Sequence, residues 1–263
     1  MSTPSPLATP SVWSLLAVGV VGGFFAGAFG LGGGLVMVPL LLWWTTMGHK
    51  QAHASSLLAI APIAIVGAVS YGVGGVFEWL PAIFVATGGI IGAQIGAWIL
   101  RAIPVGILRW AFIAFTLVSA ITLLFQLPDR SSSPEVSVLT AVLMVGLGLA
   151  MGIAAGLFGV GGGIVVIPVL VIFAGYSDLA AKSVSLLAMA PGAISGSISH
   201  LRHKTASLRD ALWVALGAIL ITPLGAAIAF VLTPRLASVL FAILLFFVAT
   251  NLIVQALRKD RKD

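Results

Sequence analysis

Long apolar runs, separated by short polar stretches, make up almost the whole chain of 263 residues. The runs predict ten helices, over residues 12–29, 35–47, 54–72, 76–100, 107–125, 136–158, 164–175, 180–201, 208–232 and 236–256. Most of them approach the length that a membrane span requires, which is about 20 apolar residues. The runs 35–47 and 164–175 are shorter, because they rise only about 18–20 Å against a hydrocarbon core of about 30 Å. We interpret both as half-helices.

The composition identifies these runs as membrane helices rather than as a globular core. Hydrophobic residues make up 60% of the chain and charged residues only 8%, and the mean hydropathy of +1.19 is far above that of a globular protein. The chain has no cysteine, which excludes disulfides and thiolate metal sites. The net charge of +6 lies in short loops and at the C-terminus, which indicates orientation in a membrane and no binding of nucleic acid. We therefore expect an all-α polytopic membrane protein in a lipid bilayer, with no metal and no cofactor.

The second half of the chain repeats the first half at a constant offset of 129 positions. The box FGLGGGLVMVP at residues 29–39 returns as FGVGGGIVVIP at residues 158–168, and the same offset superposes Ser56 on Ser185. This predicts a first transmembrane repeat over residues 12–126 and a second over residues 136–257. The remaining parts are a polar N-terminal tail, a linker and a basic cytoplasmic tail, at residues 1–11, 127–135 and 258–263.

The distribution of lysine and arginine predicts that the two repeats are inverted. If each repeat is a glycine-broken helical hairpin plus three transmembrane helices, the linker and the C-terminus lie on opposite faces of the membrane. One face then carries ten basic residues and the other only Arg130, Lys182 and Arg235, whereas parallel repeats give at best eight against five. The positive-inside rule makes the first face cytoplasmic, and that face holds both termini. The sequence leaves open whether the first two helices of each repeat form a re-entrant hairpin or two full crossings.

Each box places a glycine cluster and a proline at the depth of the membrane. A broken helix at this depth leaves backbone groups unpaired, which is tolerated only within protein or beside a wet cavity. Glycine permits the turn, the first N–H groups of the following half-helix favour an anion, and the proline frees a further carbonyl. The candidate substrate-binding residues are therefore Gly30, Gly32, Gly33, Gly34, Pro39, Gly159, Gly161, Gly162, Gly163 and Pro168.

The alternative role of a glycine in a membrane helix is a notch that lets two helices pack closely. We assign this role to isolated glycines such as Gly23 with Gly27 and Gly92 with Gly96, each pair four residues apart. The two clusters differ because they interrupt corresponding positions of two repeats. Such paired interruptions favour a binding or gating element.

Polar residues inside the predicted helices are further candidates for the substrate site. Two serines open the third helix of each repeat, four in all, and their hydroxyls either donate to an anion or bond their own helix carbonyls. These serines are Ser55, Ser56, Ser183 and Ser185. Gln94 offers two amide donors, with an interhelical hydrogen bond as its alternative. His200 binds an anion when protonated or carries a proton, unless it is an interfacial residue at a helix end.

The charged residues restrict the class of transported ion. All seven acidic residues fall in loops or near helix ends, and we expect no lysine or arginine deep in the membrane. Cation transporters and carboxylate-driven proton pumps place aspartate or glutamate within the bundle, so this pattern argues against both. It predicts that the charge of an anion is met by helix dipoles, backbone N–H groups and hydroxyls.

The two boxes, with the stretches AHASSLLAIAPIAIVGAVSYGVGGVFEW and AAKSVSLLAMAPGAISGSISHLRHKTASLRD that follow them, resemble the sulfite exporter TauE/SafE family of membrane anion permeases. The resemblance covers essentially the whole chain, and two boxes in register are more specific than one. It implies transport of sulfite, thiosulfate, sulfonates or related organic anions across a bacterial inner membrane. It does not choose among these substrates.

We therefore expect a permease that moves a small sulfur-containing anion, such as sulfite, thiosulfate or an organosulfonate, by alternating access to a midplane site between inverted repeats. A passive anion channel is the alternative. An intramembrane enzyme is disfavoured, because no nucleophile or carboxylate dyad with a positioned base lies inside the membrane. The transport direction, the coupling ion (a proton or sodium) and the number of chains in the assembly, including a homo-oligomer, stay open.

Overall fold

The computed structural model describes residues 10–102, 105–125, 137–158, 161–202 and 207–259, and within these residues it consists of ten helices and no strand. The helices are α1 (Val12–Phe29), α2 (Gly34–Trp44), α3 (His49–Val73), α4 (Trp79–Ala102), α5 (Val105–Phe125), α6 (Val138–Phe158), α7 (Gly163–Ile172), α8 (Asp178–Arg202), α9 (Leu208–Val231) and α10 (Pro234–Lys259). Each of them coincides with a predicted helix, so the all-α expectation is confirmed. Over the described residues, five helices are long and apolar enough to cross a membrane by length and composition, namely α1, α3, α8, α9 and α10.

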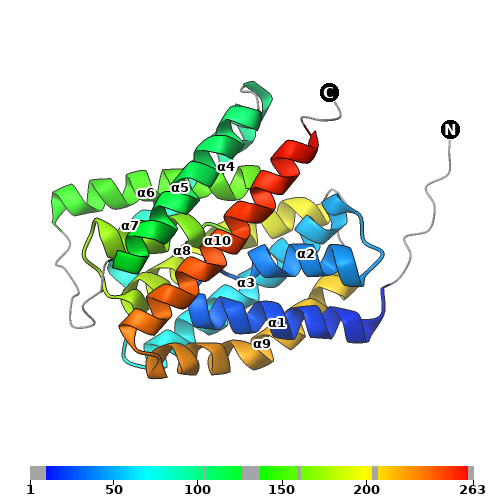
Figure 1. Ribbon diagram of the computed structural model, residues 1–263. Coiled ribbons are helices and arrows are strands. Elements are labelled where there is room, and N and C mark those ends of the chain that lie inside the picture. The colour runs from blue at the N-terminus through cyan, green and yellow to red at the C-terminus, as the bar shows by residue number, and fades with distance from the viewer. Residues whose placement is uncertain (1–9, 103–104, 126–136, 159–160, 203–206, 260–263) are drawn as a thin grey trace.

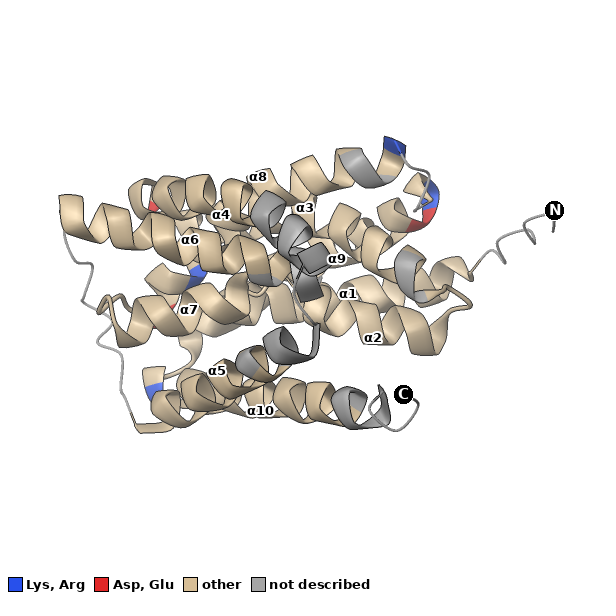
Figure 2. Ribbon diagram, turned by 90° about the horizontal axis from the view of Figure 1, so that it is seen from above, with Lys and Arg blue, Asp and Glu red and all other residues tan. Residues whose placement is uncertain are grey.

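The two short helices are even shorter than the hydropathy pattern predicts. α2 has 11 residues and α7 has 10, so they rise only about 15–16 Å at 1.5 Å per residue. Glycine turns fix where both helices begin, and each helix continues for about one turn beyond the proline that lies inside it. In Figures 1 and 2, α2 and α7 lie toward opposite ends of the bundle.

The helices of the two halves are interleaved. α1 packs along α9 and α4 packs along α6, while α3 contacts α8 and α5 contacts α10. At the 129-residue offset α1 corresponds to α6 and α4 to α9, so the first two pairs are equivalent, as a two-fold relation between the halves requires. Figures 1 and 2 show the beginning of α1 and the end of α10 at one end of the bundle, and the beginning of α6 at the other. The direction in which each repeat crosses a membrane stays a prediction.

Glycines allow the equivalent pairs to pack backbone against backbone. A β-carbon added to Gly23 would lie 2.4 Å from the carbonyl oxygen of Ala218 in α9, and one added to Gly27 would lie 2.2 Å from that of Thr222. In the other pair, a β-carbon at Gly92 would lie 2.2 Å from the carbonyl oxygen of Leu149. The notch role predicted for these isolated glycines is therefore confirmed. The surroundings of Gly96 lie outside the described residues.

The described charges lie near helix ends, and the long middle parts of the helices carry almost none (Figure 2). Large apolar side chains, among them Trp13, Val69 and Leu220, are exposed on the outside of the bundle. This is the surface that a protein surrounded by lipid presents, because lipid tails are as apolar as the core.

Candidate functional site

The first glycine turn joins α1 to α2 through backbone conformations that favour glycine. Gly30 ends α1 with a φ of 70°, and its N–H donates to the carbonyl of Ala26. Gly32 has a φ of 70° and Gly33, which precedes α2, has a φ of 77°. A side chain at any of these three positions strains the backbone, since left-handed φ values are costly for residues other than glycine. The predicted use of the cluster as a special turn is confirmed in this half.

The second glycine turn joins α6 to α7 and is not a copy of the first. Gly161 has a φ of 76°, but Gly162 has a φ of −77°, an ordinary right-handed value. Gly163 is the first residue of α7. Gly159 lies outside the described residues. The same sequence pattern therefore builds one turn with three left-handed glycines and one in which Gly161 is left-handed and Gly162 is not.

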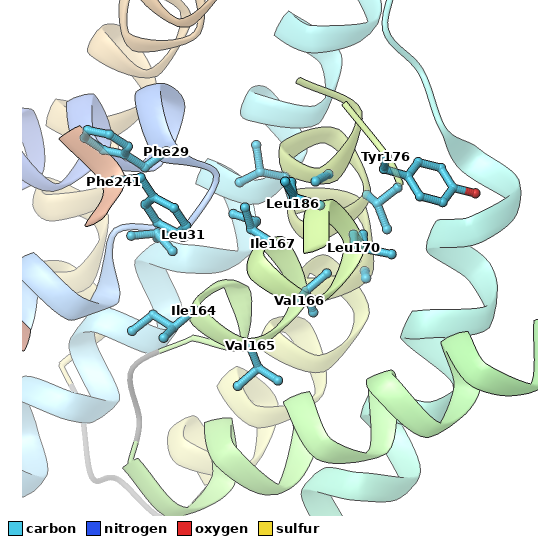
Figure 3. Close-up of a cluster of buried hydrophobic side chains, with 14 of the residues drawn as sticks. Phe29, Leu31, Ile164, Val165, Val166, Ile167, Leu170, Tyr176, Leu186 and Phe241 are labelled. Atoms are coloured by element: carbon cyan, nitrogen blue, oxygen red, sulfur yellow. The ribbon is translucent and has the colours of Figure 1, made fainter. Parts of the chain in front are cut away.

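The two turns touch each other, although they are far apart in sequence. A β-carbon at Gly163 would lie 2.8 Å from the carbonyl oxygen of Gly30 and 2.9 Å from the Cα of Leu31. A β-carbon at Gly161 would lie 3.0 Å from the carbonyl oxygen of Leu31. Figure 3 shows Leu31 facing the beginning of α7, on the side of Ile164. The backbones of the two halves thus meet at their glycine turns.

Two apolar side chains that the sequence analysis missed also lie at this meeting point. A β-carbon at Gly32 would lie 3.2 Å from Met189 Cε and 3.3 Å from Ile60 Cγ2. Ile60 in α3 and Met189 in α8 are exactly one offset of 129 residues apart. That symmetry is the signal that could have found them, whereas hydropathy alone makes them ordinary core residues.

The four candidate serines lie on α3 and α8, and they are fully buried. Ser185 donates a hydrogen bond of 2.9 Å to the carbonyl oxygen of Gly30, so it links α8 to the first turn. The hydroxyls of Ser55, Ser56 and Ser183 make no hydrogen bond to any described group. A buried hydroxyl without a partner destabilises a protein by about 1–3 kcal/mol. The protein therefore carries three destabilising hydroxyls on α3 and α8, the two helices that contact the glycine turns.

Seven other helical hydroxyls among the described residues behave differently. They donate to the carbonyl four residues earlier in their own helix, as the sequence-based alternative predicts for serine. This group comprises Ser70, Thr87, Thr116, Thr122, Ser197, Thr222 and Thr250. Ser55, Ser56 and Ser183 do not make this bond, so the alternative is wrong for them.

The remaining candidates are only partly placed. Pro39 lies inside α2, and Pro168 lies inside α7, where it is buried. Gly34 is the first residue of α2 and is buried. Gln94 lies in α4 and His200 in α8, but their side chains lie outside the described residues. The roles proposed for these two side chains therefore stay predictions.

The burial of Lys182 was not expected from the sequence. Its side chain, which the sequence analysis counted on one face of the membrane, lies in the second turn of α8 and is only 3% exposed. Its Nζ lies 3.3 Å from Oδ2 of Asp178, which is also buried. The hydropathy pattern could not show this burial, because both residues precede the most apolar part of α8. Their spacing of four residues on one helix is the signal that was available.

The described residues supply donors and no evident metal ligands. The hydroxyl of Ser185 and the backbone N–H groups of the glycine turns lie together, and no described group of three or more histidine, cysteine, aspartate or glutamate residues is placed to hold a metal ion. Sulfonate and sulfite oxygens accept hydrogen bonds from such donors. The starts of α2 and α7 add the positive ends of two helix dipoles.

Comparison with known proteins decides the family. The model of the sulfite exporter TauE/SafE family matches residues 2–123 and 144–263. The chain belongs to the sulfite exporter TauE/SafE family. The chain is thus a multi-pass membrane protein of a transporter family, and the resemblance seen in the glycine boxes is confirmed.

Curated relatives in the TauE/SafE family are named as transporters. A probable membrane transporter protein of Xylella fastidiosa (strain 9a5c) is 26% identical over 218 residues, which cover 79% of this chain and 80% of the relative. A probable membrane transporter protein of Methanocaldococcus jannaschii is 27% identical over 202 residues, which cover 73% of each chain. A third, from Bacillus subtilis (strain 168), is 36% identical over 86 residues, 33% of this chain and 32% of its own.

Proposed function

We propose that this TauE/SafE family protein is a permease for a small sulfur-containing anion such as sulfite, thiosulfate or an organosulfonate. The observation that carries the proposal is the presence of three fully buried serine hydroxyls without a protein partner, on the two helices that flank the contact between the glycine turns. The protein acts in a bacterial inner membrane with both termini cytoplasmic, as the positive-inside rule predicts. It binds the anion through these hydroxyls and through the free N–H groups at the starts of α2 and α7.

The close contact of the turns favours alternating access over a passive channel. The backbone of Gly163 leaves no space for even a β-carbon against Gly30 and Leu31, and Gly30 leaves none against Lys182. An open anion pore needs a continuous wet path, which such contacts between backbones do not leave. A permease that closes around its site needs such contacts, and it opens by moving one half against the other.

The test is anion binding and uptake by the purified full chain. We expect sulfite, thiosulfate or taurine to raise the melting temperature in detergent, because a ligand that binds the native state stabilises it, and chloride to have no such effect. The same anion should be taken up by proteoliposomes with a saturable, low turnover. Stabilisation by sodium or potassium alone, or uptake that does not saturate, would overturn the proposed function.

Serine variants test the site itself. Exchanging both Ser55 and Ser56 for alanine should weaken the stabilising anion about tenfold or more, because a hydrogen bond to a charged group contributes about 1.5–3 kcal/mol. The melting temperature without anion should not fall, since neither hydroxyl has a partner to lose. Ser195→Ala is the matched control, because Ser195 lies exposed on α8. Unchanged anion affinity in the double variant would contradict the assignment of the site.

A further inference from the structure

A buried ion pair occupies the start of α8, where the apolar pattern predicts none. Lys182 and Asp178 are 3% and 5% exposed, and their charged atoms lie 3.3 Å apart. They line a small notch together with side chains of α5, α7 and α10, among them Leu123, Ile167, Ser238 and Phe241. The notch has room for about one water molecule, so it is too small to hold a sulfonate.

The stem of Lys182 lies against the first glycine turn. A β-carbon at Gly30 would lie 2.8 Å from Lys182 Cβ and 3.0 Å from its Cγ, so the lysine stem fills the space that the glycine leaves. The next helical turn carries Ser185, which bonds the carbonyl of Gly30, and Ser183 is the neighbouring residue with an unpartnered hydroxyl. Lys182 is therefore fixed at its base beside the proposed anion site, while a flexible four-carbon stem carries its ammonium.

The equivalent helix of the first half forms without such an ion pair. At the corresponding positions of the first half, α3 begins with His49 and carries His53, and the same helix forms without an aspartate and a lysine. Burying two charges costs several kcal/mol in desolvation, and well-packed apolar residues are often at least as stable in their place. A pair that is costly and absent from the equivalent helix calls for a functional explanation.

We propose that Lys182 is the cationic group that binds the transported anion, and that Asp178 holds its ammonium in the notch while the anion site is empty. When an anion reaches the glycine turns, the ammonium leaves Asp178 and pairs with an oxygen of the anion. In the empty site, the carboxylate of Asp178 thus takes the place of the anion as the partner of the ammonium. This inference rests on the proposed function. It adds one mobile positive charge, the ammonium of Lys182, to the helix dipoles and hydroxyls of the proposed site.

A purely structural role predicts a different outcome. An aspartate in the first turn of a helix and a lysine four residues later stabilise that helix by themselves. In that case substitutions of either residue change only the stability of the protein without anion. In the proposed exchange they also change its affinity for the anion, in opposite directions.

The experiment titrates the full chain in detergent with sulfite, thiosulfate and taurine and follows the melting temperature of each variant. For the anion that stabilises the wild type, Lys182→Gln should weaken binding about 10- to 150-fold, the effect of losing a charge-assisted hydrogen bond of about 1.5–3 kcal/mol. Asp178→Asn should tighten binding several-fold, because the competing carboxylate is gone. Arg235→Gln is the matched control and should leave the affinity unchanged, since Arg235 is an exposed cation in the first turn of α10, beside the notch.

The outcomes separate this inference from the proposed function. A wild type that no sulfur anion stabilises overturns both. Anion affinity that is unchanged in Lys182→Gln, with normal stabilisation of the wild type, overturns only the role of Lys182. If Lys182→Gln does not fold, Asp178→Asn decides: unchanged or weaker anion binding by that variant overturns the exchange.

Discussion

The beginnings of α3 and α8 occupy equivalent positions in the two repeats, yet they differ in chemistry. Both helices carry a serine at the same place, but Ser185 bonds the carbonyl of Gly30 while Ser56 has no partner among the described residues. One turn earlier, α8 carries the buried Lys182 where α3 carries His53. Helix packing is therefore shared by the halves, whereas the buried lysine and the serine bond to the Gly30 carbonyl occur in the second half. The two copies therefore keep the same helix packing but differ in the polar residues that lie beside the glycine turns.

The largest expected effect breaks the shared packing. Gly148 in α6 corresponds to Gly19 in α1, and an added β-carbon would lie 2.0 Å from the carbonyl oxygen of Val85 in the first case and 2.1 Å from that of Val214 in the second. Gly148→Ala and Gly19→Ala should each lower the free energy of unfolding by about 3 kcal/mol or more, the upper range for overpacking. Denaturant titration followed by circular dichroism measures this loss in the free energy of unfolding.

The matched control lies two residues away on the same helix. Gly146 has no atom within 4 Å of an added β-carbon, and the first half already has Ala17 at the corresponding position. Gly146→Ala should therefore stabilise the protein slightly, by about 0.5–1 kcal/mol, because alanine favours a helix over glycine. Equal effects of Gly146→Ala and Gly148→Ala would show that α4 and α6 are not packed as the structure has them.

A smaller effect sharpens the difference between the two serines. Ser185→Ala should lower the free energy of unfolding by about 1 kcal/mol, because it removes the hydrogen bond to the Gly30 carbonyl. Ser56→Ala should not lower it, because that hydroxyl is buried without a partner. Thermal unfolding of the two variants side by side gives the comparison. A loss of the same size in both would mean that Ser56 has a partner in the native protein.

The smallest effect concerns a loop residue present in one half only. Tyr176, between α7 and α8, corresponds to Met47 and is 2% exposed. Burial, and then the negative charge of Glu78, raise the pKa of the Tyr176 hydroxyl above its ordinary value of 10.0. Its neutral form is therefore favoured in the folded state, and this contribution to stability is present below about pH 10 and lost as the pH rises through the folded pKa.

Replacing Tyr176 by phenylalanine tests this contribution. The melting temperature of the wild type should fall more steeply above about pH 10 than that of Tyr176→Phe. Only the wild type has a phenol there, and at high pH this phenol ionises more readily in the unfolded state than in the folded state. Melting curves at intervals on both sides of that pH measure the difference. Parallel curves for the two proteins would contradict it.

The sequence determined the helices, because hydropathy, glycine and proline act over a few residues. The bounds of α1 agree with the apolar run that predicted them, and the glycine boxes marked the places where helices end. The offset of 129 residues also paired Ser56 with Ser185. The resemblance to the TauE/SafE family, carried by the same boxes, is confirmed by the family model.

Only the tertiary structure decided how the two halves meet. The contact of Gly163 with Gly30, the hydrogen bond from Ser185 to the first turn, and the burial of Lys182 all depend on residues brought together from distant parts of the chain. The exposure of a charged side chain and the partner of a hydroxyl are properties of its neighbours in space. A local apolar pattern contains no information about those neighbours, and for this reason it did not show that Lys182 is buried.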